Sequence, residues 1–123
     1  MSAPARHRVL CVDDNRDIAD SAADLIRAFG YDALACYDGA AALAAAADFH
    51  PAVCLIDLNM PGMAGDEVAV RLRRVAGDSL KMLVAVTAMS TEEAARRIRD
   101  AGFDLHLVKP VDPRRLRAVI ASV

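Results

Sequence analysis

The feature that most constrains the fold of this sequence is a regular alternation of short apolar runs with longer segments of helical period. Five runs are typical of β-strands: Arg8–Val12, Ala33–Cys36, Ala52–Ile56, Lys81–Val86 and Leu105–Val108. The first, third and fourth runs are almost continuously apolar, as expected of strands that are covered on both faces. This pattern favours a buried parallel sheet.

The segments between these runs have the spacing of amphipathic helices. We expect helices over about Asp17–Phe29, Gly39–Ala47 and Asp66–Val75, a fourth from Ser90 to just before Gly102, and a fifth from Asp112 onwards. In the first helix the predicted apolar face is Ile18, Ala22, Leu25, Ile26 and Phe29, with Gly30 at the C-terminal end.

Several residues are suited to begin or end these helices. Asp38 is a good N-cap for the second helix, and Gly77 is expected to end the third. Ser90 and Glu93 have the spacing of a capping box at the start of the fourth helix. Asp112 followed by proline predicts a cap and first turn for the fifth.

Strict alternation of strands and helices predicts an α/β fold, a five-stranded parallel sheet with helices on both faces. Right-handed crossovers limit the possible topologies, and the flavodoxin-like strand order 2-1-3-4-5 is a common solution. The sequence contains no repeat and no low-complexity linker, so we expect residues 1–123 to form a single domain.

Composition excludes some classes of function. The net charge of −2 argues against a general nucleic-acid or membrane surface, and no apolar run is long enough to cross a membrane. Residues 1–8 contain no apolar signal region, which favours a cytoplasmic location. Cys11, Cys36 and Cys54 lack metal or redox spacing and are expected to be buried, reduced thiols.

Polar residues follow four of the predicted strands. Sites in open α/β sheets form beyond the carboxyl ends of the strands, at the switch point between the first and third strands. Asp13 and Asp14 follow the first strand and Asp57 follows the third. Three converging carboxylates repel one another unless a divalent cation such as Mg²⁺ lies between them.

Thr87 and Lys109 end the fourth and fifth strands, and they add a hydroxyl and an ammonium group to the same rim. This set of groups suits phosphoryl transfer to a carboxylate nucleophile. Taken singly, each residue has a simpler interpretation. Asp13 or Asp14 could cap the first helix, Asp57 could be a loop residue, Thr87 could be structural and Lys109 could be solvated.

The sequence resembles the receiver domain of two-component response regulators. The resemblance lies in Val9–Asn15, Leu55–Met63, Val86–Ala88 and Val108–Pro110, and it extends over essentially the whole chain. It implies a phosphoacceptor that takes a phosphoryl group from a histidine kinase or a histidine phosphotransfer protein and catalyses only its own phosphorylation and dephosphorylation. The tract from Ala101 to Asp112 resembles receivers of hybrid histidine kinases.

The resemblance implies a role for each site residue. Asp57 would be the phosphoacceptor, and Mg²⁺ would bind Asp13, Asp14, Asp57 and the backbone carbonyl of Asn59. Lys109 would pair with the phosphoryl group, and its bond to Pro110 would be cis. Thr87 would move toward the phosphoryl group as the first step of a conformational switch.

Three positions depart from the commonest family pattern. His106 stands where a switching Tyr or Phe is usual, and it could instead be an exposed ring without a signalling role. Met89 replaces a residue that is often polar, and Asn59 lies two residues after Asp57. We expect the side chains of Met89 and Asn59 to control access of water to the phosphoryl group.

Charge is distributed unevenly along the chain. Residues 1–66 contain ten acids and four bases, whereas residues 91–123 contain seven bases and five acids. The bases include Arg96, Arg97 and Arg99 on the fourth helix and Arg114, Arg115 and Arg117 on the fifth. These helices are either simply solvated or form a surface for an acidic partner or a second copy of the chain.

Three other functions are compatible with parts of the pattern. A haloacid-dehalogenase-type phosphatase would need a second acid where Asn59 stands, and a cap domain for which the chain is too short. A flavodoxin-like cofactor site would need a glycine-rich phosphate loop, where this chain has acidic residues 13–17. A degenerate receiver would act as a protein-binding module without phosphorylation.

Overall fold

Five parallel strands form one sheet in the order β2-β1-β3-β4-β5, which confirms the predicted topology. The computed structural model describes residues 7–88 and 90–123. The strands are β1 (Arg8–Val12), β2 (Asp32–Cys36), β3 (Val53–Asp57), β4 (Met82–Thr87) and β5 (Leu105–Val108). Their predicted bounds were correct to within one residue.

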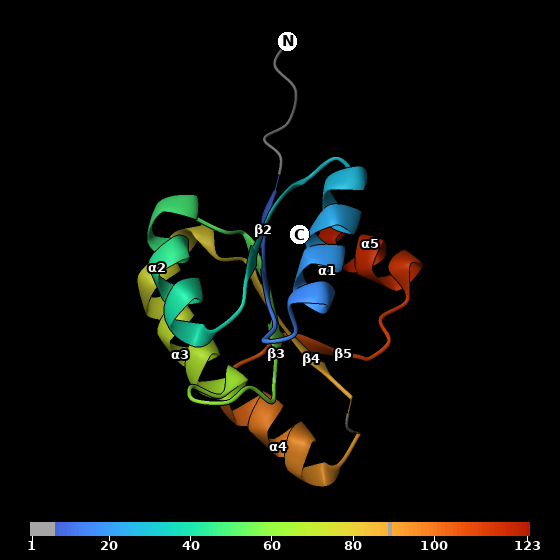
Figure 1. The fold of residues 1–123 in the computed structure, drawn as a ribbon. Helices are drawn as coiled ribbons and strands as arrows, with labels where there is room; N and C mark the ends of the chain where they lie inside the picture. Colours follow the sequence, from blue (N-terminus) through green and yellow to red (C-terminus); the bar gives the residue numbers. More distant parts are fainter. Residues whose placement is uncertain (1–6, 89) are drawn as a thin grey trace.

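Helices cover both faces of the sheet, as Figure 1 shows. They are α1 (Arg16–Ala28), α2 (Gly39–Phe49), α3 (Gly65–Ala76), α4 (Glu92–Asp100) and α5 (Pro113–Ala121), with a short 3₁₀ helix, η1 (Gly77–Ser79), after α3. In Figure 1, α2 and α3 lie on one side of the sheet and α1 and α5 on the other, while α4 lies near the carboxyl ends of the strands.

The core has two apolar layers, one on each face of the sheet. β3 is buried at all five positions and supplies both layers. Its Cys54 and Ile56 pack in the layer beneath α2 and α3, and its Val53 and Leu55 pack in the layer beneath α1 and α5. The central strand is therefore a rigid support for any group at its carboxyl end.

The observed helix caps agree only in part with the caps predicted from the sequence. Asp38 caps α2 and Asp112 caps α5 as predicted, and Gly30 has the positive φ of a residue that ends a helix. The predicted capping box at Ser90 and Glu93 is wrong. Thr91 is the N-cap of α4, because its side chain accepts a hydrogen bond from the backbone N–H of Ala94.

The predicted apolar face of α1 is correct for Ala22, Leu25, Ile26 and Phe29, which pack in or against the core layer beneath the helix, but it is wrong for Ile18. Ile18 is 41% exposed, whereas Ala19, Ala23 and Ile26 are buried against the sheet. The error arises because sequence spacing favoured the larger side chains, while the small alanines allow the helix to lie close to the sheet.

The three cysteines are buried free thiols, as predicted. Burial raises the pKa of the Cys11 thiol to about 12 and raises the pKa of Cys54 as well. Protonated, buried thiols are unreactive, so these cysteines belong to the core. Within the described ranges 7–88 and 90–123, none of the helices has the length and apolar character needed to cross a membrane.

Candidate functional site

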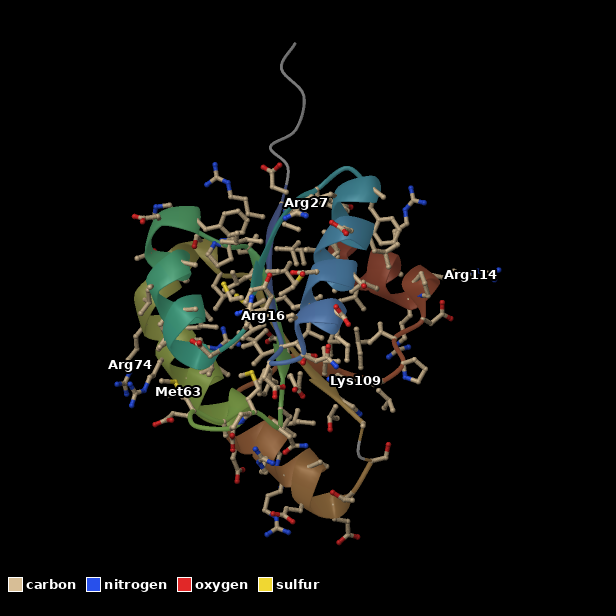
Figure 2. All side chains as sticks on the ribbon, viewed as in Figure 1. Arg16, Arg27, Met63, Arg74, Lys109 and Arg114 are labelled. Carbon is tan, nitrogen blue, oxygen red and sulfur yellow. The ribbon has the colours of Figure 1, made fainter. Side chains whose placement is uncertain are left out.

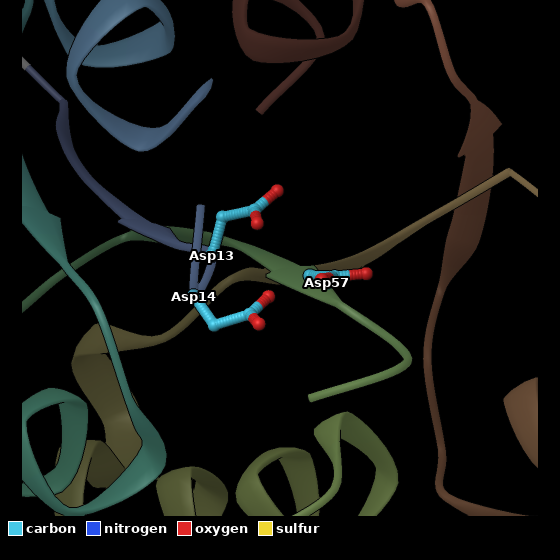
Figure 3. Close-up of side chains that lie close together, drawn as sticks. All are labelled: Asp13, Asp14 and Asp57. Carbon is cyan, nitrogen blue, oxygen red and sulfur yellow. The ribbon is translucent and has the colours of Figure 1, made fainter. Parts of the chain in front are cut away.

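Three carboxylates converge at the carboxyl ends of β1 and β3. Asp13 and Asp14 directly follow β1, Asp57 is the last residue of β3, and the two strands are neighbours in the sheet. Figure 3 shows the three side chains extending into one region beyond the strand ends. One carboxylate oxygen from each lies within 4.8 Å of the others, so the predicted convergence is confirmed.

The three acids differ in their exposure to solvent. Asp13 is 5% exposed and Asp57 is 6% exposed, whereas Asp14 is open to solvent. The backbone N–H of Asn15 donates to Asp13, and the backbone N–H of Asn59 donates to Asp57. These bonds fix the two buried carboxylates. Neither Asp13 nor Asp14 caps α1, because the side chain of Asn15 accepts from the first turn of the helix.

Lys109 joins the group from the end of β5. Its Nζ donates to a carboxylate oxygen of Asp13 at 2.8 Å and lies 3.6 Å from an oxygen of Asp57. Figure 2 shows Lys109 at the end of the sheet where α1 begins. Burial alone would lower the pKa of Lys109, but the hydrogen bond to Asp13 and the charge of Asp57 outweigh it and raise the pKa.

Asp57 is electrostatically strained in this arrangement. Burial and, next, the negative charge of Asp13 raise the pKa of Asp57 to about 6, and Lys109 only partly opposes this rise. One lysine cannot neutralise three carboxylates. Clustered carboxylate oxygens with one side open to solvent suit a hard divalent cation that keeps part of its water shell. Asp13, Asp14 and Asp57 therefore fit a metal site.

Thr87 lies at the carboxyl end of β4, the strand next to β3. It is the last residue of β4 and fully buried, and its backbone carbonyl accepts a hydrogen bond from the backbone N–H of Lys109. The register pairs Asp57 with Val86, so Thr87 lies one residue further along the adjacent strand. The Lys109–Pro110 bond is cis, as the resemblance implied.

His106 lies apart from the carboxylates. It is exposed in the middle of β5, an edge strand, and its register partner is Ala85. Ala85 belongs to the apolar layer that also contains Ala94 and Ile98 of α4, so His106 is on the α4 face of the sheet. The predicted switching role of His106 stays a prediction. Met89 lies outside the described residues.

Arg97 is a site-related residue that the sequence did not reveal. Its guanidinium donates to the amide oxygen of Asn59 at 2.9 Å and to the carbonyl of Leu58 at 3.1 Å. It also pairs with both carboxylate oxygens of Asp66, and this hydrogen bonding lowers the pKa of Asp66. The expectation that Arg97 belongs to a free basic surface is wrong, because its donors are used within the chain.

The other basic residues of the last two helices are exposed. They are Arg96 and Arg99 on α4 and Arg114, Arg115 and Arg117 on α5. No pattern in the sequence distinguishes Arg97 from these residues. Its partners lie 31 to 39 positions earlier in the chain, at the end of β3 and the start of α3.

Comparison with known families and relatives agrees with this geometry. The model of the response regulator receiver domain matches residues 9–121. The chain is 34% identical over 117 residues to the DNA-binding response regulator MtrA of Mycobacterium tuberculosis, covering 95% of this chain and 50% of MtrA. It is 36% identical over 115 residues to the sensory transduction protein RegX3 of Mycobacterium bovis, covering 94% of this chain and 49% of RegX3. The chain spans about half the length of these relatives.

Solved structures show the same fold over nearly the full length of both chains. The chemotaxis protein CheY4 of Vibrio cholerae superposes with a TM-score of 0.89 at 28% identity, covering 97% of this chain and 99% of CheY4. A CheY-like receiver domain protein from Methanospirillum hungatei gives a TM-score of 0.86 at 26% identity, with 96% and 93% covered.

Proposed function

The chain belongs to the response regulator receiver domain family, and from this we propose that Asp57 accepts a phosphoryl group in a two-component phosphorelay. One observation carries the proposal: the buried Asp57 carboxylate lies beside Asp13 and Asp14, with the ammonium of Lys109 3.6 Å away. The phosphodonor would be a phosphohistidine on a histidine kinase or a histidine phosphotransfer protein. In this role the domain modifies only itself.

The proposed cofactor is Mg²⁺. Asp13, Asp14 and Asp57 would hold it through carboxylate oxygens, and Asn59 through its backbone carbonyl. When bound, the metal supplies positive charge to the oxygens of the transferring phosphoryl group. Support for this assignment comes from the donor set, which consists of hard oxygen ligands with Asp14 on an open, solvated side.

Asp57 is the nucleophile in this mechanism. A carboxylate oxygen attacks phosphorus in line, the new O–P bond forms as the N–P bond of phosphohistidine breaks, and the electron pair of that bond remains on the imidazole. Asp57 must be ionised for this attack. A pKa of about 6 leaves it mainly ionised at pH 7 and above. Lys109, whose pKa is raised, stays protonated and balances the added charge.

The proposed output begins at Thr87. Phosphorylation adds a charge of about −1.5 to −2 at the end of β3, and the hydroxyl of Thr87 on the neighbouring strand would donate to a phosphoryl oxygen. The resulting shift of the β4 end would bias the positions of His106 and α4, which share one face of the sheet. The change selects between two existing conformations of the domain.

The second candidate function is a degenerate receiver that binds a partner without phosphorylation. One observation favours it: His106, at the usual aromatic switch position, is exposed on an edge strand. A receiver of this kind would bind its partner equally well with and without a phosphoryl group on Asp57.

Intact-mass measurement separates the two functions. The protein is incubated with Mg²⁺ and acetyl phosphate, and we expect one phosphoryl unit to be added. The added mass should be absent without Mg²⁺ and absent in Asp57→Ala. Asp48→Ala is a matched control, because Asp48 is an exposed acid at the far end of α2. No added mass in correctly folded wild-type protein would favour the degenerate receiver.

The partner surface is proposed to be the exposed arginines of α4 and α5. These charges would receive an acidic partner or a second copy of the chain, and the test is Arg96→Glu combined with Arg115→Glu. Loss of partner binding with phosphorylation intact would support this surface, and unchanged binding would exclude it. The single domain over residues 1–123, the hybrid-kinase context and the cytoplasmic location stay predictions.

A further inference from the structure

Arg97 joins α4 directly to the loop that follows the phosphoacceptor. Its Nη1 donates to the amide oxygen of Asn59 and its Nη2 to the carbonyl oxygen of Leu58. Its Nε and Nη2 bind the two carboxylate oxygens of Asp66 at 3.1 and 3.0 Å, at the start of α3. One side chain thus connects three segments: α4, the loop after β3 and the first turn of α3.

The guanidinium geometry is essential to this arrangement. All three nitrogens of Arg97 donate, and the two parallel bonds to Asp66 fix the plane of the guanidinium. Because arginine has donors but no acceptor, Asn59 must turn its amide oxygen toward Arg97. A lysine has a single ammonium group and cannot hold Asp66, Asn59 and Leu58 in the same geometry.

The contacts of Arg97 matter to α4 because the helix has little apolar support. Ala94 and Ile98 are its only buried residues, so the apolar area that holds it to the sheet is small. Segments with few buried apolar contacts open at low free-energy cost. The polar contacts of Arg97 are therefore a substantial part of what holds α4 in place.

The same contacts fix the loop beside Asp57. The carbonyl of Leu58 accepts from the backbone N–H of Gly65 at 3.1 Å as well as from Arg97. The peptide between Leu58 and Asn59 is held from both α3 and α4. The next carbonyl along the chain, that of Asn59, is the backbone ligand of the proposed metal site.

We propose that Arg97 is a positioning residue that couples the metal and phosphoryl site to α4 without passing through Thr87 or His106. This inference rests on the proposed function, because it assigns Asn59 as a metal ligand. A group bound at Asp57 and Asn59 restrains the loop, the restrained loop holds Asn59 and Leu58 against Arg97, and Arg97 holds α4. Coupling of this kind is reciprocal, so α4 also influences the affinity for metal.

Metal titration of the unphosphorylated protein tests whether Arg97 positions the metal site. Mg²⁺ affinity is measured by calorimetry on wild type, Arg97→Ala and Arg97→Lys. Loss of a residue that orients a metal ligand typically weakens metal binding by at least about tenfold, and we expect about this loss in Arg97→Ala. We expect little recovery in Arg97→Lys, because lysine lacks the planar fork.

Hydrogen exchange tests whether Arg97 couples the metal site to α4. In wild type we expect Mg²⁺ to slow amide exchange throughout α4, whereas in Arg97→Ala exchange in α4 should no longer respond to Mg²⁺. Arg96→Ala is the matched control, since it removes an exposed arginine from the neighbouring position of α4. Asn59→Ala provides a second test, because replacing Arg97 in that background should have a smaller effect than in wild type.

The possible failures are distinct. Wild-type protein that does not bind Mg²⁺ would overturn the proposed metal site, and this inference with it. Mg²⁺ binding of equal affinity in wild type and Arg97→Ala, with the same exchange response in α4, would overturn the coupling alone. An equal loss in Arg96→Ala would also overturn it, because the effect would then come from positive charge and not from the contacts.

Discussion

At the scale of single residues, Asp57 shows how the fold can raise the cost of ionising one carboxylate. It is buried next to Asp13 and balanced only partly by Lys109, so ionising it in the absence of metal costs free energy. That cost is removed when positive charge enters the site. The same cost would favour metal binding and, in the proposed function, attack of Asp57 on phosphorus.

The strain at Asp57 predicts a pH-dependent gain in stability for Asp57→Asn. The folded-state pKa of about 6 lies above the ordinary value of 3.8, so the folded protein binds more protons than the unfolded chain between these values. Stability conferred by protonated Asp57 is therefore lost as pH rises through about 6. In metal-free buffer at pH 7–8, Asp57→Asn should be more stable than wild type by on the order of 1–3 kcal/mol.

Urea unfolding in EDTA from about pH 3 to pH 8 measures this difference. The difference should shrink as pH falls through 6 and vanish below the unfolded pKa of 3.8. Asp66→Asn is a control of opposite sign, because Arg97 lowers the pKa of Asp66. It should destabilise the protein at pH 7, and its effect should fade as pH falls below 3.8. Wild type and Asp57→Asn of equal stability at pH 8 would contradict the predicted strain.

The site residues were predictable from sequence to different degrees. Asp13, Asp14, Asp57 and Lys109 follow strands, and strand order alone brings such residues to one rim. The contacts of Arg97 were not predictable, because they depend on how α4 and α3 are oriented relative to each other. A helical pattern shows which residues face solvent on average, but not which exposed arginine meets an acid 31 positions away.

At the scale of elements, the start of α4 depends on a single cap. Sequence spacing predicted a box at Ser90 and Glu93, but Thr91 accepts the hydrogen bond from Ala94 N–H at 3.1 Å. Two adjacent hydroxyl residues are both suitable caps by sequence. Local spacing does not distinguish them, because the packing of Ala94 and Ile98 that places the start of α4 is a tertiary effect.

Alanine substitution at the two hydroxyl residues tests this assignment. Thr91→Ala should destabilise the protein by about 1 kcal/mol, because it removes the acceptor of the Ala94 N–H. Ser90→Ala is the matched control and should change stability by less than about 0.5 kcal/mol. Chemical denaturation of both variants gives the comparison. A larger loss of stability in Ser90→Ala than in Thr91→Ala would show that Ser90 is the N-cap, as the predicted capping box requires.

The start of α3 lies directly against the backbone of Asp57 and Leu58. A Cβ at Gly65 would clash with the carbonyl oxygen of Asp57 and lie 2.8 Å from the Cα of Leu58. Both are backbone atoms at the end of β3 and in the residue that follows it. The absence of a side chain at Gly65 therefore lets α3 begin directly against the site.

Gly65→Ala should be destabilising even though alanine favours helices more than glycine does. The clash with backbone forces the loop to move, at a cost of about 1–3 kcal/mol, and should also weaken Mg²⁺ binding. Gly39→Ala is the comparison, because the three atoms nearest to its Cβ would be side-chain atoms of Val68 and Met63. It should be less destabilising and leave Mg²⁺ affinity unchanged. Equal effects of the two variants on Mg²⁺ affinity would contradict the close contact with Asp57.

At the scale of the whole molecule, the acidic site lies at the end of the buried centre of the sheet, whereas α4 has few buried residues. The carboxylates are carried by β1 and β3, which are buried in the centre of the sheet, whereas α4 buries only two residues. A central strand can open only when both apolar layers open. A ligand at the strand ends would therefore stabilise the whole domain, and in the proposed function the signal would be read by α4, a helix with only two buried residues.

This arrangement predicts that Mg²⁺ raises the melting temperature of the entire domain. A ligand that binds only the folded state stabilises it by RT ln(1 + [L]/Kd), which is about 1.4 kcal/mol for each tenfold rise in concentration above Kd. The melting temperature should climb with the logarithm of Mg²⁺ concentration, and EDTA should reverse the rise. Circular dichroism and a probe of the core should report the same midpoint, because the site opens only with global unfolding.

Substitutions of two exposed acids identify the source of this stabilisation. Asp14→Asn removes one of the three clustered carboxylates and should abolish most of the Mg²⁺ response. Asp24→Asn removes an equal charge from α1 at a position paired with Arg27, away from the cluster, and should leave the response intact. If both variants lost the response equally, the metal would be screening the net acidity of residues 1–66, and the carboxylate cluster would not be a specific site.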